Sequence, residues 1–391
     1  MKKKIDLLFA SQYMRAMKPN GDFEIFLSAP PGLEAVLCDE VKAHGFRAPK
    51  AVPGGVRIEG RWHDVWRANL VVRGASRVLA RLDSFRIEQL DKLEPRARRV
   101  PWAGVLRPGV PFRVEATCAR SRIYHTGAAA ERIARAIAAE IAAPLAEKEE
   151  AAVTITARLD NNVCTLSLDT SGALLHKRGF KEAVAKAPMR ETLAALFLRQ
   201  CGYDGTETVY DPMCGSGTFV IEAAEIAAHL APGRARSFAF EQLATFDAAR
   251  WQALREAALA NAVTPAVRAF GSDRDANAIA MSEANAERAG VAGFTTFEPQ
   301  SIGAAEPPDG PPGLVILNPP YGTRIGDKKK LHALYRALGA RLTEAFAGWR
   351  VGMITSEPAL AKATGLPFLP PSAPVPHGGL RITLYRTEKL G

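Results

Sequence analysis

The sequence predicts an α/β fold with a doubly wound parallel sheet for residues 189–391, and an α+β region before it. A length of 391 residues exceeds the usual size of one domain, so at least two domains are expected. After residue 189, apolar strand-like segments alternate with helix-like segments, which is typical of a parallel sheet covered by helices. Before it, short strands and amphipathic helices are mixed, which indicates one or two small α+β units.

The α+β region begins with Phe23–Ser28, whose residues alternate as in a strand. Leu33–Gly45 predicts an amphipathic helix that Gly45 ends. We expect further strands at 56–58, 76–82 and 112–116, and helices at 63–70 and 128–143. The segments 153–160 and 163–169 predict a hairpin that turns at Asn161-Asn162.

The α/β region follows a polar, basic segment, which we interpret as a linker over residues 172–188. Helices are expected at 189–200, 218–229, 276–289 and 330–346. Strands are expected at 208–210, 268–272, 294–297, 313–317 and 350–355, with a terminal antiparallel strand at 379–386.

Composition excludes several classes of protein. No apolar run approaches the ~18 residues of a membrane-spanning helix, and we interpret residues 1–22 as a loose leader or extension without a targeting role. The five cysteines are scattered and never spaced CxxC, which disfavours both disulfides and structural zinc. The seven histidines form no HxxxH pattern. We therefore expect a cytoplasmic protein without a bound metal, and nothing indicates an obligate protein partner.

Charge is unevenly distributed along the chain. Residues 1–188 contain 31 Lys and Arg against 21 Asp and Glu, whereas residues 189–391 contain 20 of each kind. The whole basic excess therefore lies in the N-terminal half, with clusters at 96–99, 120–122 and 176–178. A single cluster of this kind is usually just a solvated surface. An asymmetry of ten charges favours a phosphate-rich partner, such as structured RNA.

The segment 207–224, ETVYDPMCGSGTFVIEAA, predicts a cofactor turn between a strand and a helix. Gly215 and Gly217 allow close approach of a ligand, and the following helix offers free N–H groups to an anion. Asp211, at the end of the strand, can bind an amine. A ligand with both carboxylate and ammonium groups fits, as in the methionine part of S-adenosylmethionine, whereas the spacing needed for a dinucleotide is missing.

The next predicted strand ends in Asp273-Arg274-Asp275. An acidic residue at this point of an α/β fold can hold the hydroxyl groups of a ribose. Asp275 is better suited to cap the helix that begins near Ala276. We therefore assign the ribose to Asp273.

The tetrapeptide Asn318-Pro319-Pro320-Tyr321 directly follows the apolar strand 313–317 and predicts a catalytic loop. The prolines fix the backbone and remove donors. The Asn318 side-chain oxygen and the Pro319 carbonyl can accept hydrogen bonds from an –NH2 group, which orients its nitrogen toward a sulfonium methyl. Tyr321 can stack on a base turned out of its stack.

These motifs resemble those of class I, Rossmann-like amino-group methyltransferases. The wider chain, from about Phe23 onward, is similar to the RlmL-type bacterial 23S rRNA guanine-N2 methyltransferases, including PGLE at 31–34, GGVRIEG at 54–60 and LHKRGF at 175–180. The resemblance implies a ferredoxin-like subdomain at 23–75, a THUMP RNA-binding domain at 76–171 and a methyltransferase domain at 189–391. It also implies cofactor contacts from the turn after the first strand and from the next strand: Asp211, Met213, Cys214, Gly215, Gly217 and Asp273. Asn318, Pro319, Pro320 and Tyr321 would hold the target base.

Two departures from the family leave questions about the site. Many relatives have an acidic residue after the third strand that contacts adenine, where this chain has Gln300 and Ser301. Some relatives carry a second methyltransferase domain, for which this sequence shows no second set of motifs. Methylation of a ring nitrogen is therefore not expected here.

The substrate is also open. The Asn318–Tyr321 pattern occurs in enzymes that modify DNA adenine or glutamine side chains, and the basic half favours RNA. We expect guanine N2 of 23S rRNA or a large-subunit precursor as the substrate. Guanine N2 of transfer RNA is the alternative, and a catalytically silent RNA-binding assembly factor is a candidate from another class.

Overall fold

The computed structural model describes residues 21–182, 189–322 and 328–391. Most of the expected leader, residues 1–20, and the end of the expected linker, residues 183–188, lie outside these ranges. Two compact units are present. The first comprises the described residues of Met1–Ala29, Cys38–Leu175 and Arg236–Ala257, and the second comprises the described residues of Pro30–Leu37, His176–Ala235 and Ala258–Gly391. No helix within the described ranges is long and apolar enough to cross a membrane.

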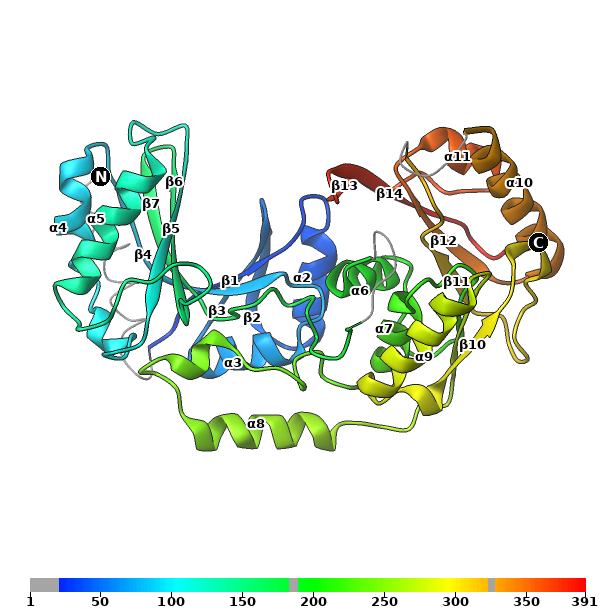
Figure 1. Ribbon diagram of the computed structural model, residues 1–391, viewed down its shortest axis with the longest axis horizontal. Helices are drawn as coiled ribbons and strands as arrows, with labels where there is room; N and C mark the ends of the chain where they lie inside the picture. Colours follow the sequence, from blue (N-terminus) through cyan, green and yellow to red (C-terminus); the bar gives the residue numbers. More distant parts are fainter. Residues whose placement is uncertain (1–20, 183–188, 323–327) are drawn as a thin grey trace. The chain divides into compact units, whose positions relative to one another are not determined.

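The first unit is built on a seven-stranded sheet in the order β2-β3-β1-β4-β7-β6-β5, seen in Figure 1. Its strands are β1 (Phe23–Ser28), β2 (Arg47–Val52), β3 (Gly55–Gly60), β4 (Arg77–Arg86), β5 (Phe112–Ala119), β6 (Val153–Asp160) and β7 (Val163–Asp169). All neighbours are antiparallel except β5 and β6. Its helices include α3 (Trp62–Val71), α4 (Leu93–Ala97), α5 (Thr126–Ala138) and most of α8 (Ala248–Ala260).

The first part of this sheet has the ferredoxin-like arrangement. Along the chain the elements run β1, α2 (Glu34–Ala43), β2, β3, α3 and β4, and the strands pair in the order β4-β1-β3-β2. A βαββαβ unit with this antiparallel order is the ferredoxin-like motif. The α+β fold expected for the N-terminal half is confirmed, while its division at residue 75 and the name THUMP for 76–171 stay predictions.

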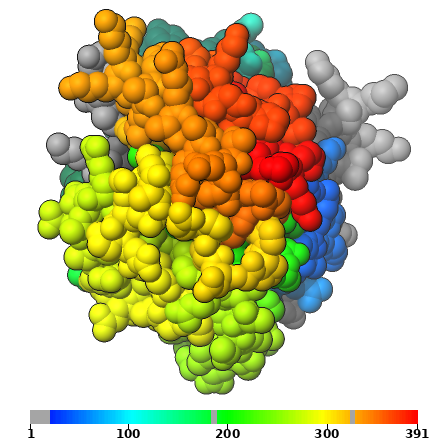
Figure 2. Space-filling view, turned by 90° about the vertical axis from the view of Figure 1, so that its right-hand side faces the viewer, coloured from blue at the N-terminus to red at the C-terminus, as the bar shows by residue number. Residues whose placement is uncertain are grey.

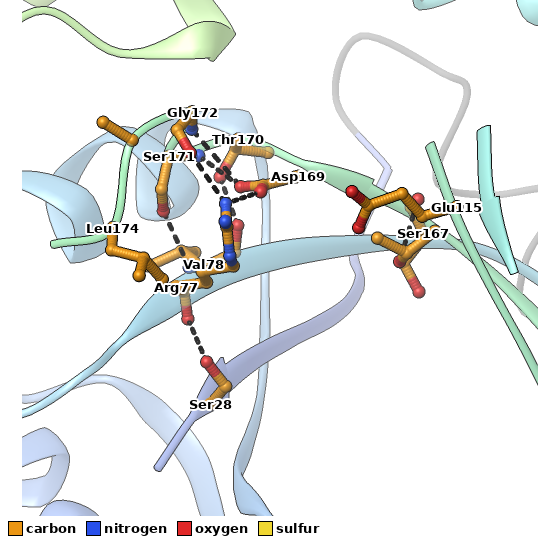
Figure 3. Close-up of polar contacts among 12 residues, drawn as sticks. Ser28, Arg77, Val78, Glu115, Ser167, Asp169, Thr170, Ser171, Gly172 and Leu174 are labelled. Carbon is orange, nitrogen blue, oxygen red and sulfur yellow. Dashed lines mark hydrogen bonds and ion pairs between the residues drawn. The ribbon is translucent and has the colours of Figure 1, made fainter. Parts of the chain in front are cut away.

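A buried polar network joins β4 to the end of β7. Figure 3 shows Arg77 between Asp169 and the Gly172 carbonyl, to which its guanidinium donates. The Ser171 hydroxyl accepts a 2.8 Å hydrogen bond from the Val78 N–H. Burial raises the pKa of Asp169, which Arg77 opposes. Polar groups so deeply buried need such partners, and the network fixes the chain where it leaves the sheet.

The segment Arg236–Ala257, which the sequence analysis places in the methyltransferase domain, packs with the first unit. Its Phe240 lies 6.1 Å from Trp66 of α3, centroid to centroid, and 5.0 Å from Trp251. The Arg236 guanidinium donates to the carbonyls of Ser171, Ala173 and Leu174. The predicted domain boundaries do not anticipate this packing, because aromatic residues in an inserted segment give no sign of which core they will enter.

The second unit contains a doubly wound sheet in the order β10-β9-β8-β11-β12-β14-β13. The first five strands are parallel, and β14 is antiparallel to both of its neighbours. The seven strands of this sheet are β8 (Val209–Asp211), β9 (Ala269–Asp273), β10 (Thr295–Pro299), β11 (Leu314–Leu317), β12 (Arg350–Thr355), β13 (Val375–His377) and β14 (Leu380–Arg386). The expected α/β fold is confirmed.

The helices of the second unit include α6 (Glu191–Gln200), α7 (Thr218–Ala227), α9 (Ala276–Ala289), α10 (Lys328–Ala345) and α11 (Pro358–Ala363). An apolar cluster between the sheet and α10 includes Tyr210 and Phe346, whose rings stack at 5.6 Å. In Figure 2 the C-terminal residues (red) lie against orange residues of the α10–β12 region. This agrees with the 2.8 Å hydrogen bond from the Leu390 N–H to the Trp349 carbonyl.

Candidate functional site

The predicted site residues lie where four neighbouring parallel strands end. Asp211 ends β8, Asp273 ends β9, and the tetrapeptide from Asn318 follows β11, while Gln300 follows β10. Parallel strands present their carboxyl ends at one edge of the sheet, which is where open α/β folds bind ligands. The fold therefore brings to one edge residues that lie up to about 110 positions apart in the chain.

Asp211 is a buried carboxyl group with only 2% of its surface exposed. Its Oδ1 accepts a 3.0 Å hydrogen bond from the Met213 N–H. Burial raises its pKa to about 8, and the nearby charge of Asp273 contributes in the same direction. A buried carboxylate gains most from a cationic partner, so this position suits a ligand ammonium group.

The glycine turn links Asp211 to α7. Gly215 and Gly217 have φ values of 56° and 80°, in the left-handed region that glycine adopts without strain. A Cβ atom on Gly217 would lie 3.1 Å from the Cβ of Ser282, so the turn also needs the small residue for packing. Gly217 occupies the cap position of α7 without a side-chain cap, which leaves first-turn N–H groups available to an anion.

Asp273 connects the glycine turn to β9. Its Oδ2 accepts a 3.0 Å hydrogen bond from the Gly215 N–H, and its Oδ1 accepts one of 3.0 Å from the Asp275 N–H. Asp275 caps α9 through the Asn277 N–H, as the sequence predicts. The two aspartates thus have separate structural roles, and only Asp273 touches the glycine turn.

Cys214 is not suited to nucleophilic chemistry. Burial raises the pKa of its thiol well above the ordinary value, so the thiol stays neutral. Its backbone N–H donates to the Ser272 carbonyl at 2.9 Å. Cys214 therefore serves to fix the turn beside β9.

The loop after β11 contains an unpartnered acceptor. Oδ1 of Asn318 is buried and has no hydrogen-bond partner among the described residues. An unsatisfied buried acceptor costs about 1–3 kcal/mol, which a ligand donor can recover. Tyr321 packs against the apolar cluster that includes Tyr335, and burial raises the pKa of its hydroxyl to about 12, so it stays neutral.

Residues distant in sequence hold this loop in place. The Tyr335 hydroxyl of α10 donates to the Pro320 carbonyl at 3.3 Å, and Glu357 accepts a 2.9 Å hydrogen bond from the Gly322 N–H. Neither residue belongs to a recognisable motif, so the sequence analysis did not single them out.

The glycine turn also has supports that the sequence analysis missed. The Ser282 hydroxyl donates to the Gly215 carbonyl at 2.9 Å, and Asn285 donates to the Ser216 carbonyl at 3.2 Å. Both residues lie on α9, three positions apart, and therefore face the turn from one side.

Lys181 is a further support, at the start of α7. Its ammonium group donates to the hydroxyl of Thr218, the first residue of α7, at 2.8 Å and lies 3.1 Å from Oε1 of Glu191. A third, longer contact of 3.4 Å reaches the Met189 carbonyl. The lysine side chain is 11% exposed and the glutamate 8%. These acceptors match the three donors of an ammonium group, so Lys181 ties the start of α6 to the start of α7.

Gln300 lies directly after β10 and contacts residues of β8 and β9. Its N–H donates to the Asp273 carbonyl at 2.9 Å, and its Oε1 accepts from the Tyr210 hydroxyl at 3.3 Å. Gln300 therefore lies beside the end of β9, next to Asp273, the residue that is expected to bind the ribose. Ser301 occupies the position before the short 3-10 turn Ile302–Ala304, without a side-chain capping hydrogen bond.

The residues at this edge are compatible with S-adenosylmethionine. A buried carboxylate, a tight glycine turn at a helix N-terminus and a second acid on the next strand match its ammonium, carboxylate and ribose groups in turn. Within the described ranges, no three His, Cys, Asp or Glu side chains lie close enough to hold a metal ion.

Comparison with known proteins identifies both regions. Residues 178–367 match the family described as "RMKL-like, methyltransferase domain", and residues 24–79 match the "RlmL ferredoxin-like domain". The chain is 36% identical over 388 residues to "Ribosomal RNA large subunit methyltransferase K/L" of Hahella chejuensis, covering 95% of this chain and 54% of that protein. The chain spans about half the length of the curated relatives it matches.

Solved structures agree with this fold. A predicted N6-adenine-specific DNA methylase from Listeria monocytogenes has a TM-score of 0.85 and 29% identity, covering 96% of this chain and 98% of that one. SMU.472, a putative methyltransferase complexed with SAH, has a TM-score of 0.84 and 25% identity, covering 94% and 98%. The chain therefore contains a region that matches the RlmL ferredoxin-like domain, followed by a region that matches the RMKL-like methyltransferase domain, which is a class of enzyme that uses S-adenosylmethionine.

Proposed function

We propose that this chain transfers a methyl group from S-adenosylmethionine to the exocyclic N2 amino group of a guanine in 23S rRNA. The observation that carries the proposal is the buried Oδ1 of Asn318, an acceptor without a partner among the described residues, in a loop beside the cofactor turn. An exocyclic amino group is the kind of donor that would satisfy it.

Each group of residues at the site has its own role in binding the cofactor or the target base. Asp211 binds the ammonium group of the cofactor, the turn from Met213 to Gly217 takes its carboxylate, and Asp273 takes its ribose. The bound cofactor would supply an electrophilic methyl group and leave as its neutral thioether, and the methylated nitrogen would lose one proton to solvent. Asn318 and the Pro319 carbonyl accept hydrogen bonds from the amino group, which frees the nitrogen lone pair and aims it. Orientation and preorganised dipoles then lower the barrier.

Tyr321 gives the flipped base a stacking surface, and its hydroxyl keeps its proton near neutral pH because burial raises its pKa to about 12. The Pro320 ring restricts the backbone of the loop, and the Tyr335 hydroxyl donates a hydrogen bond to the Pro320 carbonyl. The loop is thus fixed before substrate arrives, so little of the binding energy is lost in ordering it.

The substrate assignment is supported by charge and by relatives. All of the net positive charge lies in residues 1–188, where phosphates would be neutralised. The Hahella relative carries the name of a large-subunit ribosomal RNA methyltransferase. We infer that the partner is structured RNA, either 23S rRNA or a large-subunit precursor, and that the chain acts in the cytoplasm.

The test is a methyl-transfer assay with the purified chain, labelled S-adenosylmethionine and RNA from a strain that lacks the corresponding gene. Ribosomal and transfer RNA are assayed separately, and the labelled nucleosides are identified by mass spectrometry. N2-methylguanosine in 23S rRNA supports the proposal. Label in transfer RNA alone, on adenine, or in neither RNA contradicts it.

A further inference from the structure

The loop between β5 and α5, residues 120–125, is held firmly by the β6–β7 hairpin in the first unit. Arg120 donates to both carboxylate oxygens of Asp160, at 2.8 Å each. The Ser121 hydroxyl accepts a 2.9 Å hydrogen bond from the Asn162 N–H, and the Arg122 N–H donates to the Asn162 side chain at 2.8 Å. Ile123 is buried, so its neighbours on both sides are turned outward.

The outward residues include an aromatic pair. Tyr124 is 70% exposed, and no other Phe, Tyr or Trp side chain in the described ranges is classed as exposed. The ring of His125, also exposed, lies 4.1 Å from that of Tyr124, centroid to centroid. The hydrogen bonds of Arg120, Ser121 and Arg122 hold the preceding part of the loop, so a partner would have less of it to order.

Two arginines precede this pair in the loop, and each contacts one carboxylate. The side chains of Arg120 and Arg122 are 69% and 72% exposed. Arg122 contacts Glu88 at 2.8 Å, but a guanidinium group has five N–H donors, and one contact leaves others for a second acceptor. Helix α5 begins at Thr126, directly after the pair, with no side-chain cap and no acidic residue in its first turn. Its N-terminus therefore adds to the attraction for an anion.

We propose that residues 120–125 form an RNA contact in which an unpaired base stacks on Tyr124 and the adjoining phosphate binds Arg122 and the start of α5. The inference rests on the proposed function in taking RNA as the partner. An exposed ring flanked by arginines is the combination that binds single-stranded nucleotides, because every base has a face that can stack. Bases inside a duplex are already stacked and cannot use it.

The test uses the full chain and two fluorescent RNAs, a mixed-sequence single strand and a duplex of the same sequence. Both are about 20 nucleotides long, which exceeds the length of one contact site. Tyr124→Ala should weaken single-strand binding by about 5- to 150-fold, the equivalent of 1–3 kcal/mol for one stacked base. Tyr124→Phe should bind as the wild type does, and duplex binding should change little in both variants. Leu145→Ala is the matched control, since Leu145 is 64% exposed in the same unit but lies outside the loop.

The phosphate contact has its own readout. Log affinity falls as log salt rises, and Arg122→Gln should make this slope less steep by about 1. Tyr124→Ala should leave the slope unchanged. If Tyr124→Ala is folded by circular dichroism and binds the single strand with wild-type affinity, the proposal is overturned. A protein would then be the partner to test for this loop. A chain that binds RNA through Tyr124 but transfers no methyl group would contradict the proposed function alone.

Discussion

The backbone N–H of Gly215 donates a 3.0 Å hydrogen bond to Oδ2 of Asp273. This bond joins the turn after β8 to the end of β9, so the two expected cofactor contacts are set relative to each other before the cofactor arrives. The second oxygen of Asp273 is held by the Asp275 N–H. Both carboxylate oxygens are thus oriented, and each keeps further capacity to accept a hydrogen bond.

Asp273 and Asp275 provide a matched pair of variants. Asp273→Ala should raise the Kd for S-adenosylmethionine by about tenfold or more, since hydrogen bonds to charged groups are worth ~1.5–3 kcal/mol. Asp275→Ala should lower the free energy of unfolding by ~1 kcal/mol through loss of the helix cap and leave the Kd nearly unchanged. Calorimetry and urea unfolding separate the two effects. Equal losses of affinity in both variants would contradict the ribose assignment.

The raised pKa of Asp211 predicts proton release on cofactor binding. Without ligand the carboxyl group titrates near 8, so it is mostly protonated at pH 7, and an ammonium group would displace that proton. Calorimetry in buffers of different ionisation enthalpy should detect the release in the wild type. Asp211→Asn, which has no such proton, should bind more weakly and show no release from this site. Buffer-independent binding heats in the wild type would contradict the assignment.

The same group predicts a pH dependence of stability. Because the pKa in the folded state lies above its ordinary value, the folded chain binds more protons than the unfolded chain between pH about 4 and 8. The contribution of Asp211 to stability is therefore fully present at the acid end of this window and is lost as pH rises through it. Thermal melts of the ligand-free wild type and Asp211→Asn should diverge in that direction, and parallel curves would contradict burial of the acid.

Lys181 should act as a positioning residue for the cofactor. Lys181→Met removes the bond to Thr218 at the start of α7 and leaves Glu191 buried without its cation. Loss of one partner of a buried pair typically costs ~3–5 kcal/mol. We expect a large fall in unfolding free energy and a higher Kd for S-adenosylmethionine, with Lys181→Arg recovering part of both. Lys177→Met, at an exposed position four residues earlier, is the control. Normal affinity in a folded Lys181→Met would show that the lysine is only structural.

Local patterns predicted much of the fold. The hairpin of β6 and β7 was predicted at its observed bounds, because Asn161 and Asn162 tolerate the positive φ values of 52° and 61° that its turn requires. Helix α9 was also predicted at its observed bounds, since Asp275 caps it and Gly290 ends it. Strand β2 was missed, because it lies at a sheet edge, contains Pro49 and shows no alternation in burial.

The expected helix at 128–143 is shorter in the structure, where α5 begins at Thr126 and ends at Ala138. Its alanines continue past that point, and propensity alone gave no reason to stop there. For the site, the contiguous motifs around Asp211, Asp273 and Asn318 could be found in the sequence. Their supports could not, because Lys181, Ser282 and Glu357 reach the site through tertiary contacts that no local spacing encodes.

Tyr321 should contribute its ring and not its hydroxyl. Tyr321→Ala should lose activity, since one stacked base is worth roughly 1–3 kcal/mol. Tyr321→Phe should keep most of it, because the hydroxyl stays neutral with a pKa of about 12 and the ring alone stacks. The affinity for S-adenosylmethionine should be nearly the same in both variants. An inactive Tyr321→Phe would reveal a role for the hydroxyl that the proposed chemistry lacks.

The most direct test of the proposed chemistry is the single-turnover rate of methyl transfer from bound S-adenosylmethionine to a 23S rRNA fragment in the wild type and in Asn318→Ala. The buried Oδ1 of Asn318 matters most as the amino nitrogen rehybridises, so its loss should lower the rate by ~100-fold or more. Cofactor affinity should stay nearly unchanged, because Asn318 belongs to a different strand end from the glycine turn. A wild-type rate in a folded Asn318→Ala would contradict the account.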